Sequence, residues 1–173
     1  FPEQVEKVFV IKEIENSDFL IGTNKGLWKY EAKSEILLRI FPEINFPVRS
    51  LCYINGKVYV GTSNGIYIID KEQKLEHLRI TDEISAYNQI IGAYATAKDI
   101  WFLSPEGIIA YTLSTGGIRV YGKDVKFTSK LSCVVGNDKL LYIGTVTHGV
   151  VIFDMLSGEY SSFLPSVGNN HVS

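Results

Sequence analysis

The segment VYVGTSNGIYIID, residues 58–70, decides the fold class of this chain. It contains an apolar triplet, a Gly-Thr pair, a short polar turn that ends in glycine, and a second apolar run. Runs of Val, Ile and Tyr between turn residues are typical of β-strands rather than helices. The segment therefore predicts two antiparallel strands that are joined by a tight turn.

This segment is one copy of a pattern that recurs four times in the 173 residues. The other copies read FLIGTNKGLWKYE from Phe19, IWFLSPEGIIAYTL from Ile100 and LYIGTVTHGVVIFD from Leu141. The spacings between the anchor residues are 39, 42 and 41, and these anchors are Gly22, Gly61, Leu103 and Gly144. A four-stranded propeller blade repeats at about 40–45 residues. HEAT and armadillo repeats are of similar length, but they need apolar residues at helical spacing, which these segments lack.

The second copy shows where the strands of one unit lie. We expect the inner strand over 48–54, the next two strands over 57–61 and 66–70, and the outer strand over 75–80. Asn55-Gly56, a dipeptide suited to positive φ at both central positions of a hairpin turn, joins the first two strands. The strands are apolar at nearly every position, which indicates sheets that are covered on both faces by neighbouring sheets.

We therefore predict an all-β fold, a β-propeller of four consecutive four-stranded antiparallel blades. The blades are expected at residues 5–40, 48–80, 90–121 and 131–163, with 164–173 as the start of a next blade. Phe1-Pro2-Glu3 recurs as Phe41-Pro42-Glu43, and Val172-Ser173 stand where Val48-Arg49 begins the second unit. Both ends of the chain thus fall on one phase of the repeat, and the chain is interpreted as a fragment of a larger propeller.

Four blades alone would leave the outer faces of the first and the fourth exposed, and such apolar faces need cover. Three arrangements provide it: a closed four-bladed ring, two copies in an eight-bladed ring, or a larger ring completed by remaining blades of the same chain or of a second copy.

Composition excludes several classes of partner. With 17 basic and 19 acidic residues the net charge is −2, so no positive field indicates nucleic acid or an anionic membrane surface as a partner of this segment. No apolar run approaches the roughly 20 residues that span a bilayer, and the opening FPEQVEKVFV has no signal-peptide pattern. Any export signal or anchor is expected elsewhere.

Cysteines and aromatic residues are expected to be structural. Cys52 and Cys133 fall on inner strands of different blades, too far apart for a disulfide, so we expect two buried free thiols. The large aromatic residues in the strands are expected to form the core between blades. They are Trp28, Tyr59, Trp101 and Tyr142.

Several motifs carry a family resemblance. Tyr59-Val60-Gly61-Thr62 and Tyr142-Ile143-Gly144-Thr145 match a central strand motif, Asn169-Asn170-His171-Val172 matches an opening motif, and residues 111–116 and 153–160 match a closing Thr-Gly or Ser-Gly turn. Together they resemble the regulator-propeller repeat of hybrid two-component sensors, which is common in gut Bacteroidetes. The third copy departs most, since Leu103-Ser104 replaces Gly-Thr, and the first has Ala32-Lys33-Ser34 at the turn.

The resemblance implies a function for the segment. It implies a seven-bladed propeller in the periplasmic sensor region of an inner-membrane histidine kinase, which acts as a homodimer and reaches the membrane only through the parent chain. The ligand would be an oligosaccharide, and its detection would signal to a transcriptional response. The segment itself would carry no catalysis and no cofactor.

The candidate ligand-contact residues lie on the face where the connections between blades and the turns between second and third strands open. Arg49 begins the second inner strand near the central channel, and either an anionic sugar or a salt bridge would satisfy it. Tyr87, Asn88 and Gln89 form an aromatic–amide group in the longest connection, suited to stacking on a sugar or to packing over the blade edge. The two remaining candidates are His148 and His171.

No motif indicates chemistry. His77, His148 and His171 lack metal-ligand spacing, no GxSxG elbow is present, and Asp82-Glu83 is interpreted as a solvated turn. Gly22-Thr23-Asn24-Lys25-Gly26 lacks phosphate-loop spacing and is followed by a strand. The alternatives to a sensor are a protein–protein interaction scaffold, although the Gly-His and Trp-Asp pairs of WD repeats are absent, and a propeller enzyme such as a quinoprotein dehydrogenase or a polysaccharide lyase.

Overall fold

The computed structural model describes residues 5–80, 85–122 and 129–163. Within these ranges the chain forms four antiparallel four-stranded sheets and two short 3-10 turns, Glu15–Ser17 and Ser85–Asn88, with no α-helix. In each sheet the strands pair in the order of the chain. The all-β prediction and the prediction of four-stranded antiparallel blades are confirmed.

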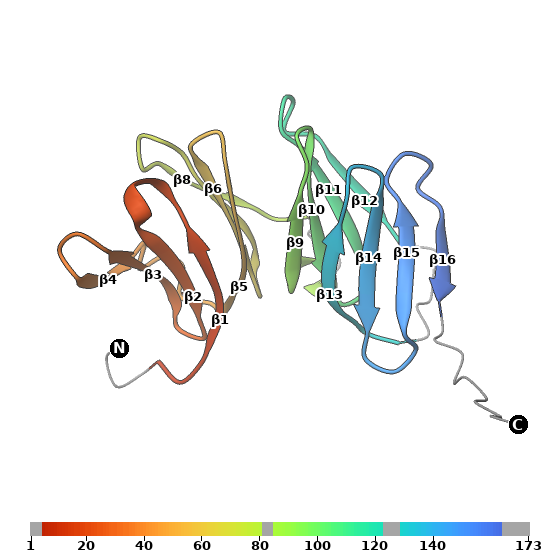
Figure 1. Ribbon diagram of the computed structural model, residues 1–173, viewed down its shortest axis with the longest axis horizontal. Helices are drawn as coiled ribbons and strands as arrows, with labels where there is room; N and C mark the ends of the chain where they lie inside the picture. The colour runs from red at the N-terminus through yellow and green to blue at the C-terminus, as the bar shows by residue number, and fades with distance from the viewer. Residues whose placement is uncertain (1–4, 81–84, 123–128, 164–173) are drawn as a thin grey trace, which may run out of the picture.

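The four blades follow one another along the chain (Figure 1). Blade 1 consists of β1 (Val8–Glu13), β2 (Phe19–Thr23), β3 (Gly26–Glu31) and β4 (Ile36–Ile40). Blade 2 consists of β5 (Val48–Ile54), β6 (Lys57–Thr62), β7 (Gly65–Ile69) and β8 (Leu75–Leu78). Blade 3 consists of β9 (Gly92–Ala95), β10 (Asp99–Ser104), β11 (Gly107–Thr112) and β12 (Ile118–Tyr121). Blade 4 consists of β13 (Leu131–Gly136), β14 (Leu140–Thr145), β15 (Val150–Asp154) and β16 (Tyr160–Phe163).

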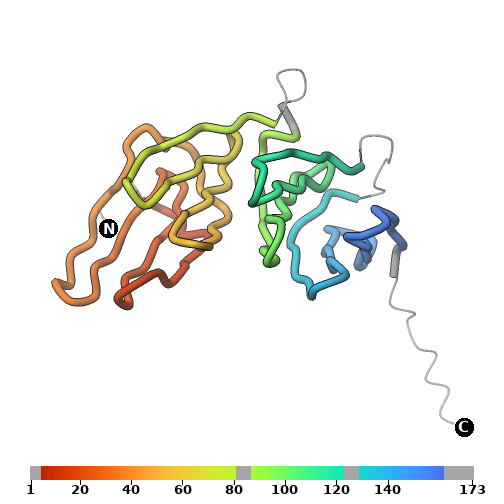
Figure 2. Tube along the Cα trace, turned by 90° about the horizontal axis from the view of Figure 1, so that it is seen from above, coloured from red at the N-terminus to blue at the C-terminus, as the bar shows by residue number. Residues whose placement is uncertain are grey.

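The first strand of each blade is the inner strand. β1 contacts β5, β5 contacts β9, and β9 contacts β13, whereas the later strands fan outward. Seen from above, the sheets form an arc with blades 1 and 4 at its two ends (Figure 2). The arrangement is that of consecutive propeller blades, and the described residues do not close into a ring.

Neighbouring blades bury each other through alternate residues of the same strands. In blade 2, Tyr59, Ile66 and Ile68 lie in the core shared with blade 3. Val60, Tyr67 and Ile69 lie in the core shared with blade 1. We call the side of a blade toward the following blade its forward face and the other its backward face. A strand that is apolar at every position thus supplies two interfaces, as the sequence indicates.

The anchor glycines are explained by close approach between blades. A Cβ on Gly22 would lie 2.6 Å from Cγ1 of Val48, and a Cβ on Gly61 would lie 2.4 Å from Cγ2 of Ile90. Val48 and Ile90 stand where the inner strand of the following blade begins, and both are fully buried. The absence of a side chain at the glycine therefore lets the next inner strand dock.

A hydroxyl closes the turn after the second strand in every blade. Thr62 Oγ1 donates to the Gly65 carbonyl at 2.9 Å and accepts from the Asn64 amide at 3.0 Å. Ser104 Oγ makes the corresponding bond to the Gly107 carbonyl at 3.2 Å. The departure at Ser104 therefore keeps the hydroxyl that the turn requires. The same role falls to Thr23 and Thr145.

Two of the predictions made from the sequence were wrong, and both concern residues of blade 4. Cys52 and Cys133 are both free, but only Cys52 is buried and Cys133 is exposed. Tyr142 was expected in the core between blades, and its side chain is 36% exposed. Cys133 and Tyr142 lie on the forward face of blade 4, and no sheet of the described residues covers that face. Tyr59 and Trp101 are buried in the cores between blades, as expected. Trp28 is also buried, but it belongs to none of the cores that the described blades share.

Candidate functional site

The connections between blades and the β2–β3, β6–β7, β10–β11 and β14–β15 turns open on one end of the molecule, which we call the loop face. The inner strands begin there, and three of them carry a β-bulge beside their first residue. The bulge residues are Phe9 in β1, Arg49 in β5 and Ser132 in β13. A bulge breaks the regular alternation and redirects a side chain, so it presents these residues at the mouth of the arc.

Arg49 is exposed and lies over an aromatic ring. Its guanidinium carbon is 4.5 Å from the ring centroid of Phe9 in the neighbouring blade. Arg49 forms no ion pair with a carboxylate of the described residues. A guanidinium stacked on a ring keeps its in-plane N–H groups free for a bidentate partner such as a carboxylate. The Phe9–Arg49 pair is therefore the candidate ligand-contact site on the loop face.

Phe9 was not predicted from the sequence. Its position in the repeat could have identified it, because Phe9 and Arg49 are both the second residue of an inner strand. The stacking itself depends on the angle between two blades, which the sequence pattern does not contain.

The group in the longest connection is mostly turned inward. Tyr87 is 4% exposed and belongs to the hydrophobic core between blades 2 and 3. Asn88 accepts a hydrogen bond from the Ile80 amide through Oδ1 at 2.8 Å, so its side chain fixes the path of the connection. Gln89 is exposed. The ring of Tyr87 is thus occupied by packing, and of the three residues Gln89 offers the most accessible side chain.

His148 occupies an exposed turn of blade 4. Its amide donates to Thr145 Oγ1 at 2.9 Å, and its Nδ1 lies 2.7 Å from Thr147 Oγ1. The hydroxyl of Thr147 donates in turn to Ser129 Oγ at 2.9 Å. His148 and Arg49 share the loop face but lie two blades apart, so they do not form one compact site. His171 lies outside the described residues.

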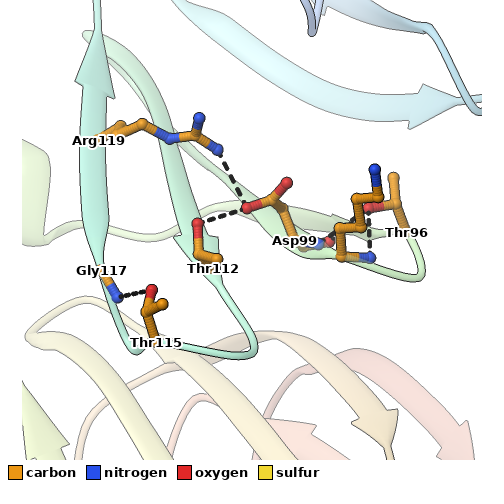
Figure 3. A network of polar contacts seen from close by, with 7 residues as sticks. Thr96, Asp99, Thr112, Thr115, Gly117 and Arg119 are labelled. Carbon is orange, nitrogen blue, oxygen red and sulfur yellow. Dashed lines mark hydrogen bonds and ion pairs between the residues drawn. The ribbon is translucent and has the colours of Figure 1, made fainter.

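The opposite end of the molecule carries a polar network that sequence analysis missed (Figure 3). The carboxylate of Asp99 accepts from Thr112 Oγ1 at 2.6 Å and from Arg119 Nη2 at 3.0 Å. This network borders a hollow of about 550 Å³ between the turns of blades 2 and 3. Asp99 stands four residues before the anchor Leu103, and Asp18 stands four residues before Gly22 with Lys29 as its partner. That shared position was the signal available in the sequence.

The described residues offer neither a metal-binding cluster nor a membrane-spanning helix. No group of three or more His, Cys, Asp or Glu side chains is placed to hold a metal ion in residues 5–80, 85–122 and 129–163. In the same ranges no helix has the length and apolar character to cross a membrane.

Comparison with known proteins establishes the fold. No family model matches the sequence. No curated protein matches it either. The extracellular domain of BT4673, a protein assigned to the hybrid two-component systems of B. thetaiotaomicron, is similar at a TM-score of 0.76 and 18% identity over 97% of this chain. The corresponding domain of BT3049 from the same organism is similar at 0.74 and 18% over 95%. This chain folds as they do.

An enzyme shares the fold equally well. Virginiamycin B lyase from Staphylococcus aureus is similar at a TM-score of 0.74 and 18% identity over 92% of this chain. The chain spans 23% of the BT4673 domain, 24% of the BT3049 domain and 56% of the lyase. At this level of identity the similarity concerns the fold, and the function has to be argued from residues.

Proposed function

We propose that this chain is a ligand-sensing segment of the extracytoplasmic propeller of a hybrid two-component sensor. The observation that carries the proposal is the combination of a motif resemblance with a fold match. The strand and turn motifs resemble the regulator-propeller repeat, and nearly the whole chain matches the fold of extracellular domains assigned to such systems. The parent chain would be a periplasm-facing histidine kinase of the inner membrane that drives a transcriptional response.

The exposed Arg49 guanidinium suggests what the segment contributes to the ligand site. A stacked arginine without a carboxylate partner among the described residues favours a planar anionic group, such as the carboxylate of a uronic acid in an oligosaccharide. Gln89 and His148 add hydrogen-bonding groups to the same face. Binding would signal only if the ligand prefers one of two receptor states, for example two arrangements of the homodimer.

Calorimetry on the complete extracytoplasmic region tests the proposal. Uronic-acid oligosaccharides and their neutral counterparts are titrated into the wild type and into Arg49→Gln. We expect binding of the acidic series, weakened at least about tenfold by Arg49→Gln. Arg39→Gln, which removes an exposed guanidinium from the outer strand β4, is the matched control and should bind as the wild type does. Equal affinity of Arg49→Gln and the wild type would overturn the role of Arg49.

A lyase activity is the second candidate, because the lyase matches this fold as well as the sensor domains do. The described residues include two histidines, His77 and His148. The ring of His77 stacks on Tyr67 with 4.2 Å between ring centroids, and its Nε2 lies 2.7 Å from the Asn64 carbonyl oxygen. His148 is therefore the histidine to test for catalysis. Incubation with virginiamycin B, followed by mass spectrometry, separates the two functions. Turnover that is lost in His148→Ala would replace the sensor proposal with an enzymatic one.

A further inference from the structure

A cavity of about 440 Å³ lies between blades 1 and 2, near the turns opposite the loop face. Its lining combines aliphatic and polar side chains. The aliphatic residues are Ile14, Leu20, Ile40, Val58 and Ile69, with Phe41 beside them. The polar residues include Glu15, Asp18, Lys29 and Tyr53. None of these residues belongs to the Phe9–Arg49 site.

The cavity stands where the other two interfaces hold a pair of aromatic rings. Between blades 2 and 3, Tyr59 and Tyr111 have ring centroids 5.6 Å apart. Between blades 3 and 4, Trp101 and Phe153 also lie 5.6 Å apart. The equivalent residues between blades 1 and 2 are Leu20 and Ile69, as the strand registers show. Two smaller side chains in place of two rings leave space that the repeat fills elsewhere.

A charge replaces an apolar residue at the same interface. Lys29 pairs with Leu20 across β2 and β3, the position that Ile68 holds opposite Tyr59 and Ala110 holds opposite Trp101. Ile68 and Ala110 are buried, whereas Lys29 is partly exposed to the cavity. Its ammonium lies 3.0 Å from Asp18 Oδ2 and 3.1 Å from Glu31 Oε1. The first interface therefore departs from the repeat in both volume and polarity.

The backbone around the cavity also departs from ordinary geometry. Three lining residues other than glycine have positive φ, namely Asn16 at 61°, Phe41 at 49° and Gln73 at 62°. Positive φ is readily adopted by Asn, uncommon for Gln and costly for a bulky residue such as Phe. Such conformations gather at binding sites more often than in purely structural regions. The conformation of Phe41 is therefore a further departure at this interface, beside the missing rings.

We propose that this cavity binds a neutral sugar ring. The C–H face of a pyranose would lie against Leu20 and Ile69 in the space that aromatic rings occupy in the other interfaces. Its hydroxyls would donate to the Asp18 and Glu15 carboxylates and accept from Lys29. The volume falls within the roughly 300–1,000 Å³ of small-molecule sites. Three carboxylates and two ammonium groups line the cavity, so its net charge of −1 does not favour an anion, and the ligand differs in charge from the one expected at Arg49.

Hydrogen bonds within the protein hold the Glu15 and Asp18 carboxylates in place. The hydroxyl of Tyr53 donates to Glu15 Oε1 and so joins the inner strand of blade 2 to the first turn of blade 1. The Ala32 amide donates to Asp18 Oδ1 at 3.1 Å. The hydrogen bond from Lys29 lowers the pKa of Asp18, so this group is a carboxylate at neutral pH and accepts from a hydroxyl. A preorganised acceptor of this kind costs less to use in binding than a mobile one.

The test is a titration of the full chain with D-glucose, D-galactose, D-mannose and N-acetylglucosamine, followed by amide chemical shifts. We expect saturable shifts at Asn16, Gly56 and Lys71 with at least one of the four sugars. Leu20→Tyr, which installs the residue that blade 2 has at this position, should weaken that binding at least about tenfold. Ile36→Tyr is the matched control, because it adds a ring at a 46% exposed position on β4 that does not line the cavity.

A second variant keeps the proposal falsifiable if Leu20→Tyr disturbs the fold. Lys29→Gln retains the size of the side chain and removes its charge, and it should weaken binding at least about fivefold. Arg49→Gln should leave this titration unchanged, which separates the cavity from the proposed sensing site. The absence of saturable shifts with all four sugars would overturn the proposal, as would unchanged affinity in a well-folded Leu20→Tyr.

Discussion

Tyr59 and Tyr142 occupy the same position of the repeat in blades 2 and 4, yet one is 4% exposed and the other 36%. Both lie two residues before an anchor glycine on the forward face of the second strand. Tyr59 meets the ring of Tyr111 from blade 3, whereas no described blade stands in front of Tyr142. The comparison shows that the strand pattern decides which way a side chain faces, and that the neighbouring blade decides whether it is buried.

The largest expected difference is in the cost of removing these rings. Tyr59→Ala should lower the free energy of unfolding by about 3–5 kcal/mol, because it leaves a cavity between two packed sheets. Tyr142→Ala should lower it by less than about 1 kcal/mol, because it removes a ring that is already partly in water. Urea unfolding followed by fluorescence measures both. Equal losses would show that the forward face of blade 4 is covered.

The reactivity of the two cysteine thiols provides a second comparison between the covered face of blade 2 and the open face of blade 4. Burial raises the pKa of the Cys52 thiol to about 11, so very little thiolate exists near neutral pH, and its side chain is also closed to reagents. Cys133 is exposed on the forward face of blade 4. At about pH 8 a disulfide reagent should label Cys133 at least about a hundredfold faster than Cys52.

Cys133→Ser serves as the control for the labelling experiment, because it should abolish the fast phase and leave the slow one. Slow labelling of both thiols in the complete parent protein would report that another blade covers this face there. Fast labelling of both thiols in the isolated chain would contradict the buried position of Cys52.

A smaller difference is expected at the anchor glycines. Gly61→Ala should destabilise the fold by about 1–3 kcal/mol, since the new methyl would lie 2.1 Å from Ser50 Oγ and 2.4 Å from Cγ2 of Ile90 in the next blade. The branched side chain of Ile90 has little freedom to move. A Cβ on Gly144 would lie 2.6 Å from Cys133 Sγ, a side-chain end that can rotate on the open face. Gly144→Ala should therefore cost less than Gly61→Ala in thermal unfolding, and the reverse order would contradict the comparison.

The smallest expected effect concerns two carboxylates with lowered pKa. The hydrogen bond from Lys29 lowers the pKa of Asp18 in the interface between blades 1 and 2. Backbone hydrogen bonds from Ser157 and Leu156 lower the pKa of Asp154 in blade 4. A lowered pKa in the folded state stabilises above the unfolded value near 3.8, and this contribution is lost as the pH falls through the folded pKa. Asp18→Asn and Asp154→Asn should therefore lower Tm at neutral pH and match the wild type near pH 2.

Salt distinguishes the two carboxylates. The effect of Asp18→Asn should shrink at high salt, because salt screens an ion pair that is partly open to solvent. The effect of Asp154→Asn should change less, because its partners are backbone amides. Thermal unfolding at neutral and acid pH, at low and high salt, measures both effects. If the change in Tm caused by Asp18→Asn does not depend on salt, the ion pair is excluded as its cause.

Much of the fold follows from local patterns. The inner strand predicted over 48–54 is β5 (Val48–Ile54), and the turn at Asn55-Gly56 has positive φ at both residues. The outer strand of blade 2 ends at Leu78, two residues before the expected end. Strands and turns are predictable because they depend on residues that are close in sequence.

The candidate site was harder to predict. Tyr87 was expected either to contact a ligand or to pack over the blade edge, and the connection folds it into the core between blades 2 and 3. Arg49 is exposed, but the ring beneath it comes from another blade. The cavity between blades 1 and 2 was not predicted, because it depends on residues about 50 positions apart, Leu20 and Ile69, facing each other.

The sequence by itself determined the repeat, the strands and the two-sided apolar pattern, because hydrogen-bonded hairpins and side-chain alternation are local properties of the chain. Only the tertiary structure decided which aromatic residues are buried, which thiol is exposed, and where an interface is left incompletely filled. Those properties depend on the surface that another blade presents, and one strand carries no information about the blade that stands in front of it.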